Sequence, residues 1–369
     1  MPPYRADIDG LRAISAIVVV LFHAQVPGFA GGFVGVDVFF VISGYLITQV
    51  LEASSGKPVR DWLAGFYLRR CRRVLPALLV LLCLVTPVAA LVLTRPELGS
   101  YGRYLGFTSV LLTNVAAWTD HTGGWPALIH LWTIAVEEQF YLLYPLVLLA
   151  VWKSRRARPL LLIGALAVAS FALSVWASYA MPTASFYLTP PRVWELLLGS
   201  LLALTPWRIK SALGREVLAA LSLLVIGVTV HVYSSRTPYA GLYALPVCLA
   251  AAGLLATGRD QSTRVARLLS VRPLVFTGLI SYSLYLWHAA ILSLVWTHWG
   301  GYPGALRLIC LLAAIWVLAA LSWRFVERPL RQGLWLKSNR RFLVAAAVLN
   351  LALAVTGLLL WKMPPRAAP

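Results

Sequence analysis

The sequence alternates between long apolar stretches and short polar connections, and this pattern constrains its fold more than any other feature. A helix of about 20 mostly apolar residues crosses the hydrocarbon core of a bilayer. We predict eleven such spans, at 11–26, 33–52, 74–93, 128–151, 159–181, 187–205, 216–233, 240–257, 273–297, 304–323 and 342–361. A membrane barrel would instead need alternating strands of about ten residues. The pattern therefore predicts an all-α, polytopic transmembrane helix bundle.

The composition agrees with a membrane protein and excludes other classes. Only 12% of the residues are charged and 60% are hydrophobic, whereas an ordinary globular domain is about 25% charged. A water-soluble fold cannot bury this much apolar surface, so a soluble cytosolic enzyme and a disordered chain are both excluded.

The basic residues indicate the direction of insertion. The formal net charge is +19, and most lysines and arginines lie in short clusters, at Arg5, 57–73, 153–158, 208–215, 259–272 and 324–341. By the positive-inside rule, these connections lie in the cytoplasm. We therefore predict a cytoplasmic N-terminus and an extracytoplasmic C-terminus. The charge then reflects topology, and nucleic acid is not an expected partner.

One further segment, 100–118, has an ambiguous pattern. It is partly apolar but contains several polar residues, and a single extra crossing would break the parity that the basic clusters require. We predict an interfacial or re-entrant placement on the outer side. The chain then divides into a membrane domain over 1–341, with ten spans and this segment, and the eleventh span with a short outer tail over 342–369.

Neither the cysteines nor the N-terminal segment shows a recognisable metal-binding, redox or signal-peptide pattern. The four cysteines lack any metal-ligand or CxxC spacing, so we interpret them as structural and expect no metal. Asp7 and Asp9 interrupt what would be the basic region of a signal peptide, and no small-residue cleavage site follows. The first apolar segment is therefore expected to be retained.

Ionisable groups within spans are costly, so each is a candidate functional residue. Arg12 and His23 are eleven positions apart, which is about 20° of rotation and about 16 Å along a helix. They therefore share one face of the first span. His23 is either a buried histidine bonded to a neighbouring helix or a general base reached along a polar seam. The sequence leaves both interpretations open.

The second span contains a carboxylate and a glycine-rich pattern. Asp37 lies near its outer end, and Ser43 and Gly44 lie deeper. Close packing of helices explains the glycines of this segment, as does close approach of a ligand, but packing does not explain Asp37.

Four arginines precede the third span: Arg69, Arg70, Arg72 and Arg73. They are either a topology anchor that contacts lipid headgroups or a phosphate cradle, since guanidinium groups bind phosphate oxygens in pairs. The residues alone do not separate these alternatives.

The fourth span carries a predicted polar stripe. His130, Glu137, Tyr141 and Tyr144 are spaced so that they share one helical face, with Glu138 about 100° away. Two adjacent carboxylates in an apolar helix favour a functional role over a purely structural one.

Two smaller groups of polar residues lie further along the chain. Arg192 and Glu195 have the i, i+3 spacing of an ion pair that forms within one helix. Ser281, Tyr285 and His288 share a face of the ninth predicted span, where His288 is expected to be a bonded core histidine.

Taken together, these motifs closely resemble a known family. In order, they read YRADIDGLRAISAIVVVLFHA, GGFVGVDVFFVISGYLIT, RRCRRVLPAL, LWTIAVEEQFYLLYP, ISYSLYLWH and RFVERPLR. The resemblance is to the bacterial acyltransferase family 3 of integral-membrane O-acyltransferases, and it covers about residues 4–331. It implies transfer of an acyl group, usually acetyl, from cytoplasmic acyl-CoA in the bacterial cytoplasmic (inner) membrane. Acetyl-CoA is thus the expected donor.

The family motifs assign roles to individual residues. Its Arg-x10-His motif falls on Arg12 and His23, and the histidine is regarded as essential for transfer. Its RxxR motif, associated with the CoA donor, falls on Arg69 and Arg72. Arg70 and Arg73 form an overlapping alternative.

The remaining motifs are matched in the same way. The SG pair falls on Ser43 and Gly44, and the intramembrane glutamate falls on Glu137. The last two signatures cover 281–288 and 324–329.

The motifs and this resemblance lead to one hypothesis for the mechanism. The CoA phosphates bind the four arginines, the pantetheine arm passes Arg12, and the thioester reaches His23. His23 then acts as general base, oriented by Asp37 or Glu137, or forms a transient acyl-histidine. The full predicted set comprises the catalytic residues His23, Arg12, Asp37, Glu137 and Glu138, the donor-binding residues Arg69, Arg70, Arg72, Arg73, Ser43 and Gly44, and the substrate-binding residues His130, Tyr141, Arg192, Glu195, Tyr285 and His288.

The acceptor is expected to be a cell-envelope glycan, such as the O-antigen of lipopolysaccharide or an exopolysaccharide. The alternatives are a small secreted metabolite or antibiotic and, from another class, a transporter of lipid-linked sugar. Many family members carry an SGNH-type domain after the last span. This sequence stops at Pro369, so we expect a stand-alone enzyme, a shortened chain or a separate SGNH-type partner.

Overall fold

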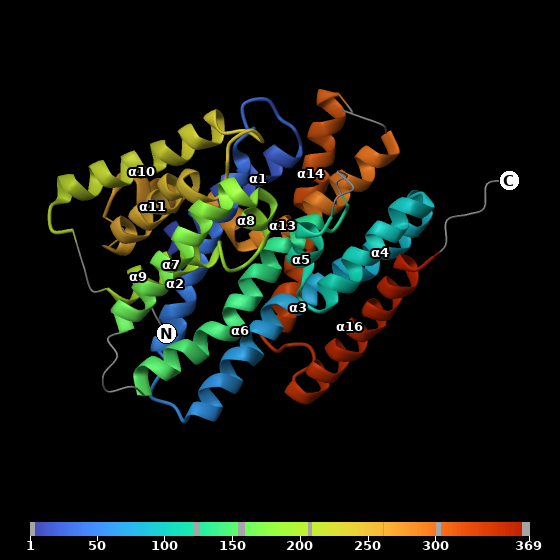
Figure 1. The fold of residues 1–369 in the computed structure, drawn as a ribbon, viewed down its shortest axis with the longest axis horizontal. Helices are drawn as coiled ribbons and strands as arrows, with labels where there is room; N and C mark the ends of the chain where they lie inside the picture. The colour runs from blue at the N-terminus through green and yellow to red at the C-terminus, as the bar shows by residue number, and fades with distance from the viewer. Residues whose placement is uncertain are drawn as a thin grey trace. The chain divides into compact units, whose positions relative to one another are not determined.

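The computed structural model describes residues 4–363 except for 121–125, 154–158, 206–208, 261 and 300–303. Within these residues every regular element is a helix and there is no strand, as Figure 1 shows. This confirms the predicted all-α class. The basic positions at 154–158 and 208, and the end of the predicted outer tail, lie outside the described residues.

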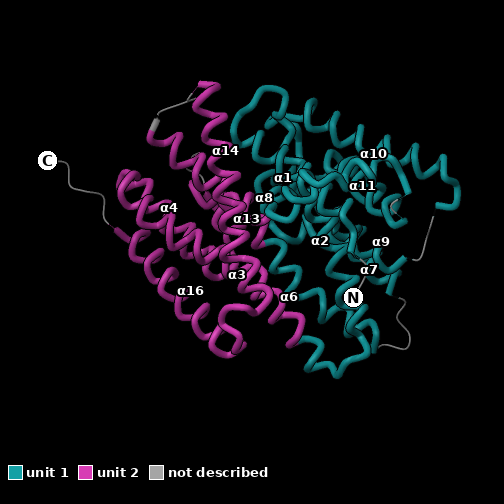
Figure 2. Tube along the Cα trace, turned by 180° about the vertical axis from the view of Figure 1, so that it is seen from behind, with its two compact units in different colours: residues 1–63, 136–281 teal, residues 64–135, 282–369 magenta. Residues whose placement is uncertain are grey.

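The chain forms two compact units, which Figure 2 colours separately. Unit 1 comprises residues 1–63 and 136–281, and unit 2 comprises residues 64–135 and 282–369. The boundaries fall within three long helices: α3 (Val59–Val92), α6 (Trp132–Lys153) and α13 (Arg272–Trp299). Each unit therefore combines segments from both halves of the sequence.

Unit 1 is built around a buried, mostly aliphatic cluster to which α1, α2, α10 and α11 contribute most of the residues. Alanines of α11, including Ala244 and Ala251, are fully buried and allow neighbouring helices to approach closely. The elements that lie wholly in this unit are α1 (Ala6–His23), η1 (Gly32–Val34), α2 (Gly35–Glu52), α7 (Pro159–Ala180), α8 (Pro182–Tyr187), α9 (Val193–Leu204), α10 (Ala212–Val232), α11 (Gly241–Thr257), η3 (Gly258–Asp260) and α12 (Arg264–Leu269).

Unit 2 contains a pair of helices that lie side by side, α4 and α16 (Figure 1). The elements that lie wholly in this unit are α4 (Arg95–Ser109), α5 (Thr113–Trp118), η2 (Ile129–Leu131), α14 (Ala305–Ser322), the π-helical turn η4 (Trp323–Glu327), α15 (Arg328–Arg331) and α16 (Asn339–Trp361).

Nine helical segments among the described residues are long and apolar enough to cross a membrane. They correspond to nine of the eleven predicted spans. The other two are also helical but differ in charge or length. Helix α1 carries three charged residues, Asp7, Asp9 and Arg12. Helix α9 has only 12 residues, because two prolines before Arg192 prevent the helix from starting earlier.

The ambiguous segment 100–118 forms most of α4 and all of α5. Helix α4 runs antiparallel to α16: Gly102 meets Gly357 and Leu360, and the Asn350 amide donates to the Ser109 carbonyl at 2.7 Å. That bond satisfies a carbonyl at the end of α4 that has no partner within the helix. The segment therefore packs along a helix that is itself long enough to span a membrane, and its interfacial or re-entrant placement stays a prediction.

Candidate functional site

Arg12 and His23 lie on one uninterrupted helix, α1, so the face that they share in the sequence is kept in the structure. The Arg12 guanidinium donates to Ser281 Oγ at 2.9 Å and lies 3.7 Å from the Asp9 carboxylate. His23 is the last residue of α1 and is partly buried. A helix C-terminus favours positive charge, which is the charge that a histidine acquires when it accepts a proton.

Three buried charged residues of unit 1 form an ion network. The Arg192 guanidinium lies 3.0 Å from Asp37 Oδ1 and 3.2 Å from Glu195 Oε1, and each side chain is at most 1% exposed. The Arg192–Glu195 pair is the one predicted from the i, i+3 spacing. Asp37 comes from α2, 155 positions earlier in the chain. Because moving charges out of water is costly, each of these groups depends on its partners.

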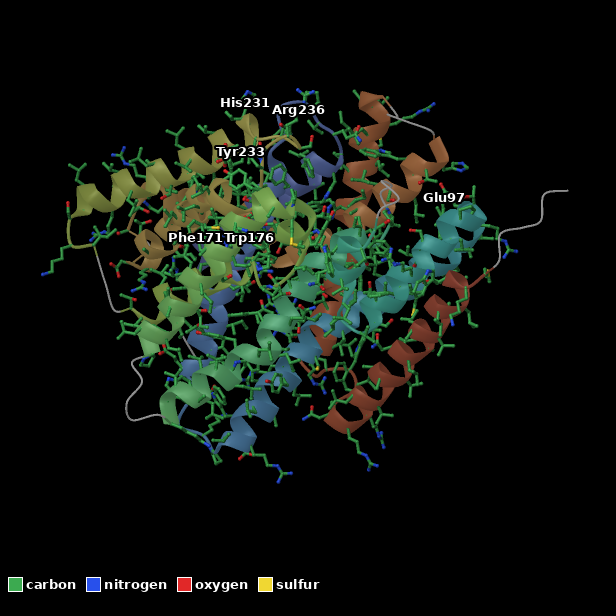
Figure 3. The ribbon with its side chains drawn as sticks, viewed as in Figure 1. Glu97, Phe171, Trp176, His231, Tyr233 and Arg236 are labelled. Carbon is green, nitrogen blue, oxygen red and sulfur yellow. The ribbon has the colours of Figure 1, made fainter. Side chains whose placement is uncertain are left out.

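Aromatic rings surround the Arg192 guanidinium. Its central carbon lies 5.5 Å from the ring centre of Phe40, 5.6 Å from that of Phe186 and 5.9 Å from that of Tyr239. Tyr239 belongs to the connection between α10 and α11 and packs against Tyr233, which Figure 3 labels at the end of α10. Burial raises the pKa of the Tyr239 hydroxyl well above its usual value. Tyr239 therefore contributes a neutral dipole to the network.

The network includes donor atoms of the kind that bind metals. One atom each from Asp37, Glu195 and Cys248 lies within 4.8 Å of the others, and carboxylates and thiolates are common metal ligands. However, the Arg192 guanidinium contacts both carboxylates and supplies the positive charge that a metal ion would bring. We therefore interpret this cluster as an ion network among side chains.

The Ser43–Gly44 pair lies where α2 crosses α9. A methyl group on Gly44 would lie 1.8 Å from the Leu196 carbonyl oxygen, and one on Gly199 would lie 2.0 Å from the Val41 carbonyl oxygen. The two glycines thus bring two backbones into direct contact. Of the two explanations for Gly44 in the sequence, helix packing is the one that these contacts favour.

Replacing Gly44 with alanine is expected to force α2 and α9 apart. Since the obstructing atom belongs to the backbone, it cannot move aside as a flexible side chain would, and the free energy of unfolding should fall by about 1–3 kcal/mol. Thermal unfolding in detergent measures this loss. Gly164→Ala on α7 is the matched control, because an added methyl there meets nothing within 4 Å. Equal stability of the two variants would contradict the close crossing.

The two adjacent carboxylates lie near the start of α6. Glu137 and Glu138 are both partly exposed, whereas Tyr141, one turn further, is 3% exposed. The Glu137 carboxylate accepts a hydrogen bond from Ser43 Oγ at 2.8 Å. The predicted SG motif and the predicted intramembrane glutamate are therefore direct partners. Tyr144 lies on the same helix and is buried.

His130 is not on α6. It lies in the 3₁₀ turn η2, which precedes the helix, and such a turn advances about 120° per residue. Over the two residues from His130 to the start of α6, this differs from the advance of an α-helix by only about 40°, so the alignment of His130 with the α6 stripe stays a prediction. Within unit 2, His130 packs with Tyr285 and His288, with ring centres 5.4–5.6 Å apart.

This three-ring cluster is bonded to the backbone. The Tyr285 hydroxyl donates to the His130 carbonyl oxygen at 2.6 Å, and His130 Nε2 lies 3.1 Å from the Leu286 carbonyl oxygen. His288 Nδ1 lies 3.1 Å from the Leu284 carbonyl oxygen. Each histidine thus directs one ring nitrogen at a carbonyl, as expected of a bonded core histidine.

The four arginines of α3 differ in their surroundings. Arg69 is exposed, and Arg70 and Arg73 are partly exposed. Arg72 is 7% exposed, and its guanidinium donates to two carbonyl oxygens and one side-chain amide of the segment 330–339. The motif therefore contains one clearly solvent-facing arginine and one that is bonded within unit 2.

Sequence reasoning missed two members of these networks. Tyr239 lies in a turn-rich connection, where no helical pattern marks it. Glu327 is 2% exposed, accepts from Ser283 Oγ at 3.2 Å and lies 3.6 Å from the Arg331 guanidinium. Its position among arginines resembles a solvated charge cluster, but it lies within the family signature at 324–329 and in a π-helical turn, a form often found at functional sites.

Comparison with known proteins agrees with the family resemblance seen in the sequence motifs. The sequence profile of a family described as an acyltransferase domain matches residues 5–324. The O-acetyltransferase OatA of Staphylococcus aureus is 31% identical over 352 residues, which cover 90% of this chain and 58% of the relative. The peptidoglycan O-acetyltransferase OatA of Listeria monocytogenes is 32% identical over 357 residues, covering 89% and 56%. The chain thus spans little more than half the length of these relatives. No solved structure matches it.

Proposed function

Because the chain belongs to the acyltransferase family whose profile matches residues 5–324, we propose that it transfers an acyl group, first of all acetyl, from cytoplasmic acyl-CoA to a hydroxyl of a cell-envelope glycan. It is a multi-pass bacterial membrane protein, and we place it in the cytoplasmic membrane. The observation that carries the proposal is the order of matched motifs on membrane helices, with a histidine and an arginine cluster among them.

The names of the relatives favour a particular acceptor class. One is called a peptidoglycan O-acetyltransferase, so peptidoglycan precursors are the first acceptors to test. O-antigen and exopolysaccharide are the second acceptors to test, because they present the same chemical group, a sugar hydroxyl. Small secreted metabolites are the third acceptors to test.

His23 is the residue we assign to proton transfer. The acceptor oxygen attacks the thioester carbonyl and its proton passes to His23. The carbon–sulfur bond then breaks, and His23 returns the proton to the leaving sulfur to give CoA thiol. In the two-step variant, the imidazole itself takes the acyl group and passes it to the acceptor. The position of His23 at the C-terminus of α1 suits either route, since the imidazole becomes cationic in both.

We assign the binding of the acyl donor to the four arginines in the first half of α3. CoA carries a pyrophosphate and a 3′-phosphate, and guanidinium groups bind such oxygens in pairs. Arg69 is the most accessible of the four arginines. We therefore assign it the direct phosphate contact.

Replacing Arg69 with glutamine should weaken CoA binding by about ten- to a hundredfold, the usual effect of losing a charge-assisted contact. Binding of labelled CoA to the detergent-solubilised protein measures this change at low and at high salt. Arg103→Gln on α4 removes the same charge from a side chain that donates to Thr119. It should bind CoA as the wild type does.

Two outcomes would change the proposal in different ways. Normal CoA binding by the Arg69 variant would move the donor site away from this residue. Absence of CoA binding and of label transfer by the wild type, with acetyl-, propionyl- and succinyl-CoA, would favour the transporter alternative. In that case, uptake of a lipid-linked sugar into vesicles becomes the next measurement.

A further inference from the structure

Arg72 is bonded on three sides to a segment more than 250 positions away in the sequence. Its guanidinium donates to the carbonyl oxygens of Leu330 at 3.0 Å and Leu336 at 2.9 Å, and to the side-chain oxygen of Asn339 at 3.0 Å. Its face covers the Phe342 ring, 4.6 Å from the ring centre. These partners belong to α15, to the connection after it and to the first turn of α16. Arg72 therefore joins three pieces of unit 2.

This bonding uses the atoms that a phosphate would need. A guanidinium binds a phosphate by directing two N–H groups at its oxygens. Both terminal nitrogens of Arg72 donate to protein oxygens, and the side chain is 7% exposed. A phosphate at Arg72 would have to break these bonds and enter a buried position. Arg69, one turn earlier on α3, is exposed.

The segment that Arg72 holds contains a backbone conformation that requires support. Leu336 has a φ of 50°, a left-handed value that is unfavourable for a residue with a side chain. Its carbonyl oxygen is one of the three acceptors of Arg72. The bond thus stabilises a conformation that the chain would not otherwise favour.

We propose that Arg72 is a positioning residue that orders the connection 332–338, and that it promotes donor binding through the cations carried by this connection and the start of α16. Those cations are Lys337, Arg340 and Arg341, all exposed. The second part rests on the proposed function, because the ligand is the phosphate group of acyl-CoA. Arg69 and this basic group would together bind the phosphates, and Arg72 would hold the basic group in place.

Hydrogen–deuterium exchange of residues 332–338 tests the positioning role directly. Arg72→Gln should make these amides exchange roughly tenfold faster, since it removes bonds to a charged donor. Arg72→Lys should resemble it, because one ammonium cannot span acceptors on three segments. Asn339→Ala removes only one acceptor and should give a smaller increase. Arg69→Gln is the matched control, with wild-type exchange.

CoA affinity, measured on the same proteins, tests the link to the donor. Arg72→Gln should bind CoA about tenfold more weakly, as should Lys337→Gln/Arg340→Gln/Arg341→Gln. Combining the two should add little, because both act on one group of cations. Adding Arg69→Gln should weaken CoA binding further, by as much as Arg69→Gln does alone. The Michaelis constant for acetyl-CoA should rise in each case while kcat stays close to that of the wild type.

The outcomes separate the proposal from its premise. Weaker CoA binding by Arg72→Gln with unchanged exchange at 332–338 would make Arg72 a direct phosphate ligand and overturn the proposal. Retained affinity in Arg72→Lys would do the same. If the wild type binds no acyl-CoA, the proposed function fails, and faster exchange in Arg72→Gln would still establish the positioning role.

Discussion

Replacing His23 with glutamine is expected to reduce acyl transfer at least about 10²–10⁴-fold, the contribution that a positioned general base makes to a rate. Glutamine retains size and hydrogen-bonding capacity but cannot accept the proton of an attacking hydroxyl. The protein should still fold, since His23 is the last residue of α1 and only partly buried. The measurement is the initial rate of label transfer from acetyl-CoA to an envelope glycan fraction, with the protein reconstituted in lipid.

A second histidine in the same unit provides the matched control. His231 lies in the last turn of α10, as His23 lies in the last turn of α1, and Figure 3 labels it there. His231→Gln should transfer label at the wild-type rate. Transfer by the His23 variant at that same rate would remove His23 from the mechanism.

The experiment also distinguishes the two chemical routes. If an acyl-imidazole forms, wild-type protein incubated with labelled acetyl-CoA and no acceptor should retain label, and the His23 variant should not. If His23 acts only as a base, neither protein retains label, and the two differ only when acceptor is present, in CoA release and in label transfer.

Features that depend on nearby residues could be predicted from the sequence. Nine of the predicted spans are found as apolar helices, because hydropathy over about 20 residues is a local property. The Arg192–Glu195 pair was predictable because i, i+3 spacing fixes contact within one helix. The 3₁₀ turn that carries His130 was not predicted, because residue spacing does not reveal such a turn.

Features that depend on contacts between distant segments were not predictable in this way. Asp37 was a conspicuous intramembrane carboxylate, but its partner lies 155 positions away. Arg72 looked equivalent to Arg69 within its motif, and only its acceptors on a segment 258–267 positions away distinguish the two. Equal residue types in one motif thus have different surroundings, which tertiary packing alone determines.

Replacing Arg192 with methionine is expected to lower the free energy of unfolding by about 3–5 kcal/mol, because it leaves two buried carboxylates without their shared cation. Asp37 and Glu195 then repel each other in a site from which water is excluded. Thermal unfolding in detergent measures the loss. The control is Arg236→Met, an exposed arginine of the same unit that Figure 3 labels, which should unfold like the wild type.

A variant without any charge in the network tests whether the charges serve stability alone or also acyl transfer. The triple variant Asp37→Asn/Arg192→Met/Glu195→Gln removes every charge while keeping side-chain volume, and buried ion networks replaced in this way often regain stability. We expect it to unfold near the wild-type temperature. If acyl transfer also returns, the network acts by holding α2 against α9. If the triple variant is stable and inactive, the charges of the network are themselves needed for acyl transfer.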